Sequence, residues 1–228
     1  MESERTIKLI GDENFAVLQK ARVAIAGLGG VGSYAAEAIA RSGIGYITII
    51  DCDAVAESNL NRQLYALRST VGKDKCEVAA RRIRDINPDI IINTKNIRIT
   101  ADNVAEAIGD MDAVIDAVDD IGAKLAIVQY CAEKGIGLIS CMGTGNKTQP
   151  DRLRVADIYE TKVCPLARKM RYELKKRQVD RLCVVYSEEA PLVKEHPPAS
   201  MVFVPACAGI FAAREVVFRL IEGWDSEE

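Results

Sequence analysis

The chain has 228 residues, of which 49% are apolar, and a formal net charge of −3. This length suffices for one large α/β domain, and no apolar run approaches the roughly 20 residues of a membrane-spanning helix. The charged start at 1–5 lacks the apolar stretch of a secretory signal, so we expect a cytoplasmic protein with no membrane partner. Seven widely spaced cysteines form no C-x-x-C pair, which argues against a disulfide framework and against zinc.

Apolar runs alternate with helical patterns along the first 140 residues, which predicts a mostly parallel sheet with helices on both faces. We expect strands at 22–26, 46–50, 90–94, 113–117 and 137–140, and helices at 31–42, 72–86, 101–108 and 122–134. Beyond Gly143 we expect strands at 153–158 and 182–186, a basic helix at 165–178, a mobile loop at 187–200 and a buried helix at 207–221. The prediction is a Rossmann-like α/β fold whose C-terminal extension completes the sheet.

A glycine-rich turn with G-x-G-x-x-G spacing follows the first strand and opens a helix; its members are Gly27, Gly29, Gly30 and Gly32. Residues without Cβ allow a tight turn that brings backbone N–H groups close to a phosphate. Asp51 ends the second strand, where a carboxylate can accept hydrogen bonds from ribose hydroxyls. These features indicate a nucleotide. Taken alone they also fit NAD, or a tight turn with no ligand.

A dense polar loop follows Asp51 and favours ATP over a dinucleotide. ATP carries about four negative charges, which Arg and Lys neutralise. The candidates in this loop are Asp53, Asn59, Arg62 and Gln63, and Lys73 and Lys75 add positive charge at the start of the next expected helix. After the fourth expected strand, Asp116 and Asp119 lie where sheet ligands gather, and a carboxylate there can hold Mg²⁺ on the phosphates.

Together these motifs resemble the ubiquitin-activating-like (ThiF/MoeB/HesA) adenylyltransferase superfamily. The resemblance implies one ThiF-type ATP-binding domain over 1–228, with Asp51 on the ribose. It places Asn59, Arg62 and Lys75 on the triphosphate, and Asp119 on the metal. In the family, an Arg from a partner subunit reaches the phosphates. Arg5 matches that position, which implies a homodimer, although a solvated tail residue is the alternative.

Downstream segments distinguish the branches of the superfamily. Sulfur-carrier adenylyltransferases usually have two C-x-x-C zinc pairs, which this chain lacks. The segments at 140–147, 155–161, 164–168 and 203–209 instead resemble the tRNA threonylcarbamoyladenosine dehydratase branch. That resemblance implies ATP-dependent cyclisation of the modified nucleoside through a carboxyl-adenylate, with 144–228 as the substrate-binding part. The alternative is activation of the C-terminal Gly-Gly of a sulfur-carrier protein, and a sulfur-transfer or carrier protein is a further candidate partner.

A basic segment at 162–181 has eight Lys and Arg residues against Glu173 and Asp180, on an otherwise acidic chain. Such a block indicates either a contact with a polyanion or a solvated helix face. Because it falls between two branch motifs, we expect it to contact tRNA. Two further residues draw attention. Cys164 could be a nucleophile at a helix start, and His196, the single histidine, is expected to be an exposed loop residue.

Overall fold

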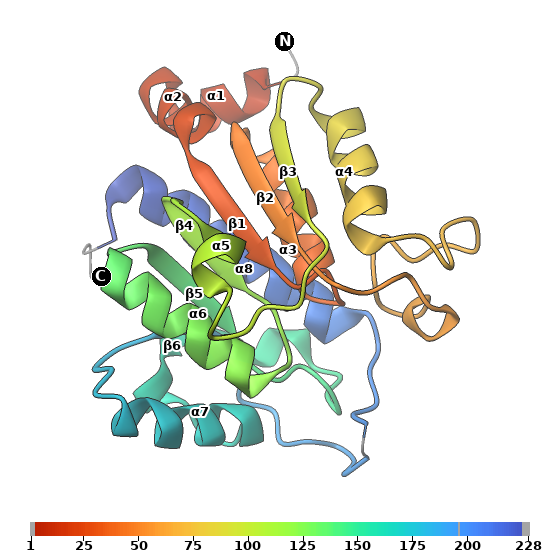
Figure 1. Cartoon of the computed structure of the whole chain (residues 1–228), viewed down its shortest axis with the longest axis vertical. Coiled ribbons are helices and arrows are strands. Elements are labelled where there is room, and N and C mark those ends of the chain that lie inside the picture. Colours follow the sequence, from red (N-terminus) through yellow and green to blue (C-terminus); the bar gives the residue numbers. More distant parts are fainter. Residues whose placement is uncertain (1–2, 196, 225–228) are drawn as a thin grey trace.

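The computed structural model describes residues 3–195 and 197–224, so the expectation for His196 lies outside the described residues. Their core is a seven-stranded sheet in the order β3-β2-β1-β4-β5-β7-β6. Figure 1 shows β1 to β5 of this sheet with helices around them. The strands are β1 (Arg22–Ala26), β2 (Tyr46–Ile50), β3 (Ile91–Lys95), β4 (Ala113–Asp116), β5 (Gly137–Cys141), β6 (Leu153–Asp157) and β7 (Cys183–Ser187). All neighbours are parallel except β6 and β7. The expected Rossmann-like fold, completed by C-terminal strands, is confirmed.

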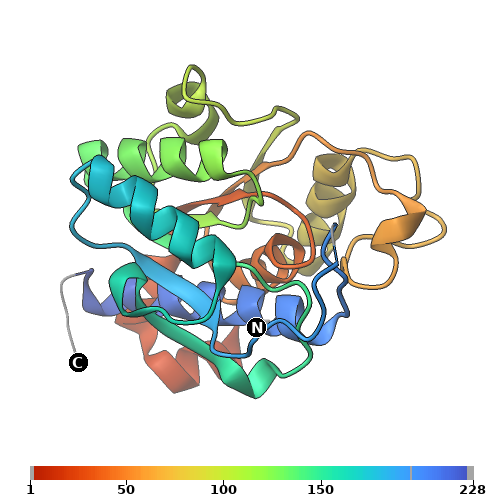
Figure 2. The same cartoon turned by 90° about the horizontal axis from the view of Figure 1, so that it is seen from below.

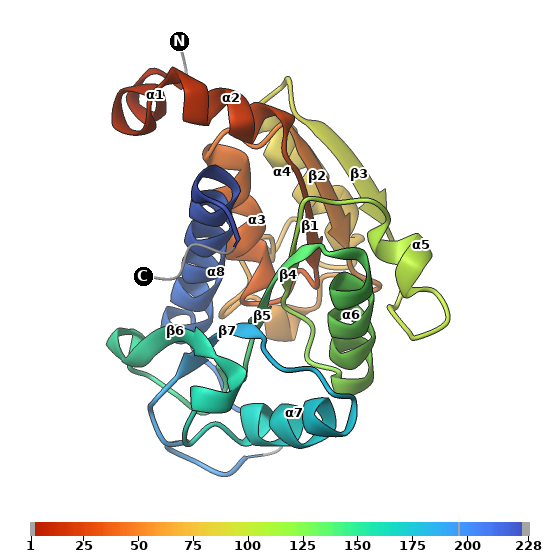
Figure 3. The same cartoon turned by 90° about the vertical axis from the view of Figure 1, so that its left-hand side faces the viewer.

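Helices cover both faces of the sheet because its central strands are apolar on both sides. In β1, Val23 and Ile25 join the cluster under α3 (Gly32–Arg41), α4 (Lys75–Ile86) and α8 (Phe203–Glu222). Ala24 and Ala26 face the other way, toward α5 (Val104–Ile108) and α6 (Ile121–Lys134). The alternation follows from the two-residue period of a strand. Figure 3 shows α8 and α6 on opposite sides of the sheet.

A third apolar cluster joins α6, α7 (Pro165–Lys176) and β7, and holds the C-terminal part against the sheet. Three short 3-10 turns, at Glu57–Asn59, Pro150–Arg152 and Ile158–Glu160, connect these elements. Figure 2, viewed from below, shows α7 beside α6. No helix of the described residues is long and apolar enough to cross a bilayer.

Two N-terminal helices were not expected from the sequence. They are α1 (Glu4–Ile10) and α2 (Asp12–Lys20), which meet at Gly11 with φ +84°. The apolar periodicity of α1 is weak, and none of its residues is buried. In contrast, α2 buries Phe15 and Leu18 and leads through Ala21 into β1. Both helices therefore lie at the amino ends of the parallel strands.

Element boundaries differ from the expected ones by three or four residues at three helix starts. Helix α5 begins at Val104 rather than at 101. Helix α4 begins at Lys75 rather than at 72, since the Asp74 side chain accepts a hydrogen bond from the Glu77 amide at 3.0 Å and caps the helix. Helix α8 begins at Phe203 rather than at 207, because Pro205 lies in its first turn, where no backbone N–H is needed. The expectation that α8 is buried holds for one face only: Ala208, Ala212 and Val216 are buried. On the other face Ile210 is 45% exposed.

The segment 187–200, expected to be a mobile loop, forms no helix or strand beyond Ser187 in its described part. Asn146 nevertheless anchors it. The side-chain oxygen of Asn146 accepts a hydrogen bond from the Ala199 amide at 2.7 Å. The backbone carbonyl of Asn146 accepts another from the Leu192 amide at 2.7 Å. Whether the segment moves in solution stays a prediction.

Candidate active site

The glycine turn lies at the carboxyl edge of the sheet, between β1 and α3. Gly27 has φ +88°, and a Cβ there would lie 2.8 Å from the Ala117 carbonyl oxygen. A Cβ at Gly32 would lie 1.8 Å from the Gly27 oxygen, so no larger residue fits without displacing the turn. Gly29 is open by comparison, with Gln63 Nε2 the nearest atom at 3.9 Å. The turn thus presents backbone N–H groups next to open space.

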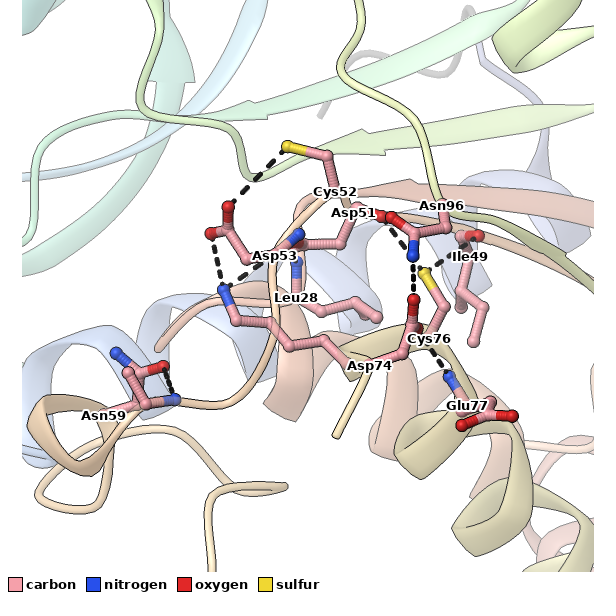
Figure 4. Close-up of polar contacts among 12 residues, drawn as sticks. Leu28, Ile49, Asp51, Cys52, Asp53, Asn59, Asp74, Cys76, Glu77 and Asn96 are labelled. Atoms are coloured by element: carbon pink, nitrogen blue, oxygen red, sulfur yellow. Dashed lines mark hydrogen bonds and ion pairs between the residues drawn. The ribbon is translucent and has the colours of Figure 1, made fainter. Parts of the chain in front are cut away.

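Asp51 contacts the glycine turn, as Figure 4 shows, and Lys75 contacts Asp51 in turn. The Asp51 carboxylate accepts hydrogen bonds from the amides of Leu28 at 2.6 Å and Asp53 at 2.9 Å. Lys75 Nζ lies 2.8 Å from Asp53 Oδ2 and 3.6 Å from Asp51 Oδ1. The hydrogen bond from Lys75 lowers the pKa of Asp53. A largely buried cation is therefore held at the edge of the turn by two carboxylates.

Asp51, Cys52 and Asp53 also bring possible metal-ligand atoms within 4.8 Å of one another. The Lys75 ammonium already supplies a positive charge between the two carboxylates, which argues against a metal ion there. Asp119 differs, because it is exposed in the turn between β4 and α6 and makes no hydrogen bond or ion pair with any described residue. Its carboxylate remains available to a cation, so Asp119 as a metal ligand stays a prediction.

The polar loop after β2 folds back onto the glycine turn. Ser33 Oγ, in α3, accepts a hydrogen bond from the Leu64 amide at 3.1 Å and so fixes the loop. Arg62, two residues before Leu64, donates a hydrogen bond to the Ser58 carbonyl at 2.8 Å. Its Cγ is close to the glycine turn, since a Cβ built on Gly30 would lie 3.4 Å from it. Asn59 lies earlier in the loop, in the 3-10 turn Glu57–Asn59, where its Oδ1 accepts a hydrogen bond from the Ala56 amide. The fold therefore brings Arg62, Gln63 and Lys75 to one edge with Asp51.

Arg5 is the one predicted site residue that the chain does not bring to this edge. It is exposed in α1, which packs on α2 at the amino ends of the strands. Figure 1 shows α1 at the opposite end of the sheet from the loop after β1. Within one chain Arg5 cannot reach the glycine turn, so its role in another subunit stays a prediction.

The sequence did not predict the buried polar cluster that lies beneath Asp119. Lys124 on α6 donates to Asp116 Oδ2 at 2.9 Å and to the Cys141 carbonyl at 2.7 Å. Ser140 Oγ donates to the same Asp116 oxygen at 2.5 Å. Asp116 is thus a buried partner of Lys124 and cannot also serve as an open metal ligand. The sequence held one signal of this cluster, because Lys124 is a charged residue on the apolar side of α6.

These features are typical of nucleotide-binding α/β proteins, and Arg62 and Lys75 place positive charge beside the turn. The sequence profile of the ThiF family matches residues 2–226, and the chain belongs to that family. It is 38% identical to the tRNA threonylcarbamoyladenosine dehydratase of Bacillus subtilis, over 93% of this chain and 92% of the relative. The Escherichia coli enzyme of the same name is 43% identical over 75% of this chain and 64% of its own length.

Solved structures agree with the sequence comparison. The crystal structure of the E. coli tRNA N6-threonylcarbamoyladenosine dehydratase, TcdA, in complex with ATP matches with a TM-score of 0.90 and 36% identity. The match covers 95% of this chain and 92% of that chain. By contrast, the sulfur carrier protein ThiS adenylyltransferase of B. subtilis aligns at 34% identity with only 59% of this chain. The likeness to the dehydratases extends through the C-terminal part.

Proposed function

We propose that this protein uses ATP to cyclise threonylcarbamoyladenosine in tRNA through a carboxyl-adenylate. The observation that carries the proposal is the likeness over 92% of the dehydratase's length, including the part beyond Gly143. The placement of Arg62 and Lys75 beside the glycine turn supports a triphosphate as the nucleotide. The pyrophosphate of a dinucleotide carries about two negative charges, fewer than the triphosphate, so two cations suit ATP better.

The reaction needs two steps. The threonyl carboxylate attacks the α-phosphorus of ATP, and pyrophosphate leaves. A carbamoyl nitrogen of the same nucleoside then attacks the activated carbonyl carbon, loses its proton and expels AMP, so that the nucleoside loses the elements of water. Because the second step is intramolecular, proximity supplies much of the acceleration and no enzyme nucleophile is required. Cys164, which is 2% exposed, is accordingly given no role.

In this proposal the protein positions charge. Asp51 binds the ribose, Asn59, Arg62 and Lys75 bind the triphosphate, and Asp53 and Gln63 line the nucleotide site. Asp119 would hold Mg²⁺, which would supply positive charge to the phosphates. The carboxylate of Asp53 orients Lys75 before ATP arrives, since their side chains are 2.8 Å apart. Preorganised cations at the phosphates stabilise the transition state without reorganisation.

We further propose a homodimer in which Arg5 completes the site of the other subunit. The distance between α1 and the glycine turn within one chain supports this arrangement. Closed two-fold dimers are the commonest soluble oligomers, and such symmetry would complete two equal sites.

The basic segment 162–181 is the proposed tRNA contact of the C-terminal part. Lys162, Arg168 and Lys169 are exposed and make no ion pair with any described residue, which suits phosphate binding. Arg171 has a different role, because it donates to the backbone and hydroxyl of Thr161 and fastens the start of α7. The tRNA contact therefore rests on the first turn and exposed face of α7.

The test is incubation of the protein with ATP, Mg²⁺ and tRNA carrying the linear nucleoside. AMP release together with a nucleoside lighter by one water supports the proposal. No mass change with folded, ATP-binding protein would contradict it. Pyrophosphate exchange that depends on a Gly-Gly-terminated carrier protein would favour the sulfur-carrier alternative.

A further inference from the structure

A hollow of about 550 Å³ lies between α6 and α7, outside the nucleotide site described above. Its floor is apolar, formed by Ile121 and Leu125 of α6, and Tyr172 of α7 adds an aromatic ring. The Tyr172 side chain is exposed, at 63%, whereas Leu125 is only 7% exposed. An exposed aromatic residue over an apolar floor is costly to leave in water and is typical of binding sites.

The rim of the hollow is basic. Arg168 and Lys169 line it from α7 and have no carboxylate partner among the described residues. Glu173 also lines it, but its carboxylate is paired with Arg177 at 2.6 Å and with Lys176 at 3.5 Å. The rim therefore presents net positive charge. Positive charge beside an exposed aromatic ring is the combination by which proteins bind single-stranded nucleic acid.

The hollow adjoins the proposed site of adenylation. Ile121 begins α6 two residues after Asp119, and Asp120 between them caps the helix. An RNA strand that places its modified adenosine near Asp119 can therefore bring a neighbouring nucleotide close to Ile121. Sequence-specific contacts to RNA commonly involve such unpaired bases stacked on aromatic side chains.

We propose that this hollow binds one unpaired nucleobase of the RNA substrate, next to the modified adenosine, by stacking on Tyr172; this rests on the proposed function. Lys176 Nζ lies 4.1 Å from the centroid of the Tyr172 ring and covers one face. The base stacks on the opposite face, over Leu125 and Ile121. Arg168 and Lys169 bind the phosphates on either side of it.

Kinetics with the variant Tyr172→Ala test the stacking. We expect the KM for tRNA to rise about tenfold, since stacking of one base contributes about 1–3 kcal/mol. The Kd for ATP and the melting temperature stay unchanged, because Tyr172 is exposed and distant from the glycine turn. Tyr172→Trp restores tight binding through a larger ring. Tyr46→Ala is the matched control, since Tyr46 is 40% exposed at the amino end of β2.

A second measurement does not depend on turnover. A synthetic RNA stem-loop with 2-aminopurine beside the target adenosine is titrated with protein, and stacking quenches its fluorescence. We expect quenching by the wild type and by Tyr46→Ala, and its loss with Tyr172→Ala.

Equal quenching by the wild type and Tyr172→Ala, or no binding of the stem-loop to the wild type, would overturn the base site. An unchanged KM for tRNA in Tyr172→Ala would do the same, and would leave the hollow to a protein partner. Failure of the proposed function looks different: the wild type would bind and quench the RNA without removing water from the nucleoside. In that case the quenching with Tyr172→Ala still decides the base site.

Discussion

Lys124 and Asp116 form an ion pair with a 2.9 Å separation in the interior, and both side chains are fully buried. The pair joins α6 to the end of β4, and the Cys141 carbonyl connects it to β5. The other carboxylate oxygen of Asp116 accepts a hydrogen bond from the Val118 amide at 3.2 Å. The pair therefore shapes the turn that carries Asp119, so a structural interaction bears directly on the proposed metal site.

The variant Lys124→Met should destabilise the protein strongly. It leaves Asp116 buried without its cation, and breaking a buried pair on one side costs about 3–5 kcal/mol. We expect the free energy of unfolding, measured by urea denaturation, to fall by that amount. The double variant Lys124→Met with Asp116→Asn removes the isolated charge and should recover part of the loss. A double variant as unstable as the single one would show that the ion pair itself is not the cause.

The variants Arg62→Ala and Asp119→Ala should abolish turnover while leaving the fold intact. Arg62 is half-buried, Asp119 is exposed, and neither belongs to an apolar cluster. Loss of a charge that stabilises the transition state typically costs about 10²–10³ in rate. AMP release measures the activity, and circular dichroism measures folding. Full activity in either variant would remove that residue from the proposed site.

The sequence predicted the parallel sheet well because its buried strands are continuous apolar runs and its glycine turn has a steric cause that no other residue satisfies. It also predicted Asp51 and Lys75 at one edge, since parallel strands align their carboxyl ends. It did not reveal which charges are neutralised within the fold. Asp116 and Asp119 look alike in sequence, yet only the packing of α6 places Lys124 on Asp116. The short helix α1 was missed because it buries nothing by itself.

Cys52 offers a chemical report on the nucleotide site. The residue lies between Asp51 and Asp53 and is exposed. The partial burial of its thiol, together with the negative charge of these two carboxylates, raises the pKa of Cys52. Because the thiolate is the reactive form, alkylation should be slow at pH 8 and faster at pH 9.5. Bound ATP should slow it several-fold further by covering Asp51. Peptide mass spectrometry follows the modification, with Cys52→Ser as the control for other thiols. If saturating ATP left the alkylation rate of Cys52 unchanged, the nucleotide would bind elsewhere on the protein.

Glu37 should make stability depend on acid pH. It joins α3 to α4 through Arg82 at 2.6 Å and also contacts Arg41 at 2.7 Å. Although burial opposes ionisation, the hydrogen bonds from these arginines prevail and lower the pKa of Glu37. Because the folded pKa lies below the unfolded value of about 4.3, the stabilisation is fully present above that value and is lost as the pH falls through the lowered folded pKa.

The variant Glu37→Gln isolates this contribution. We expect a loss of about 1 kcal/mol in the free energy of unfolding at pH 7. The loss should be smaller at pH 3, which lies below the unfolded pKa of about 4.3 and so within the range where the charge-dependent stabilisation declines. Denaturation curves at the two pH values measure it. An equal loss at both would assign the effect to packing rather than to charge.

Complementation between inactive variants tests whether Arg5 acts across a dimer. Each proposed site combines Arg62 of one subunit with Arg5 of the other, so a mixed dimer of Arg5→Ala and Arg62→Ala contains one intact site. Random exchange of subunits makes half of the dimers mixed and should restore about a quarter of the wild-type activity. The matched control mixes Arg62→Ala with Asp119→Ala, which lie in the same site of one chain; both sites of that mixed dimer stay defective. Restored activity in the control, or none in the first mixture, would contradict the exchange of Arg5. Full activity of Arg5→Ala alone would show that Arg5 takes no part in catalysis. Arg5 would then be only an exposed residue of α1, at the end of the sheet away from the glycine turn.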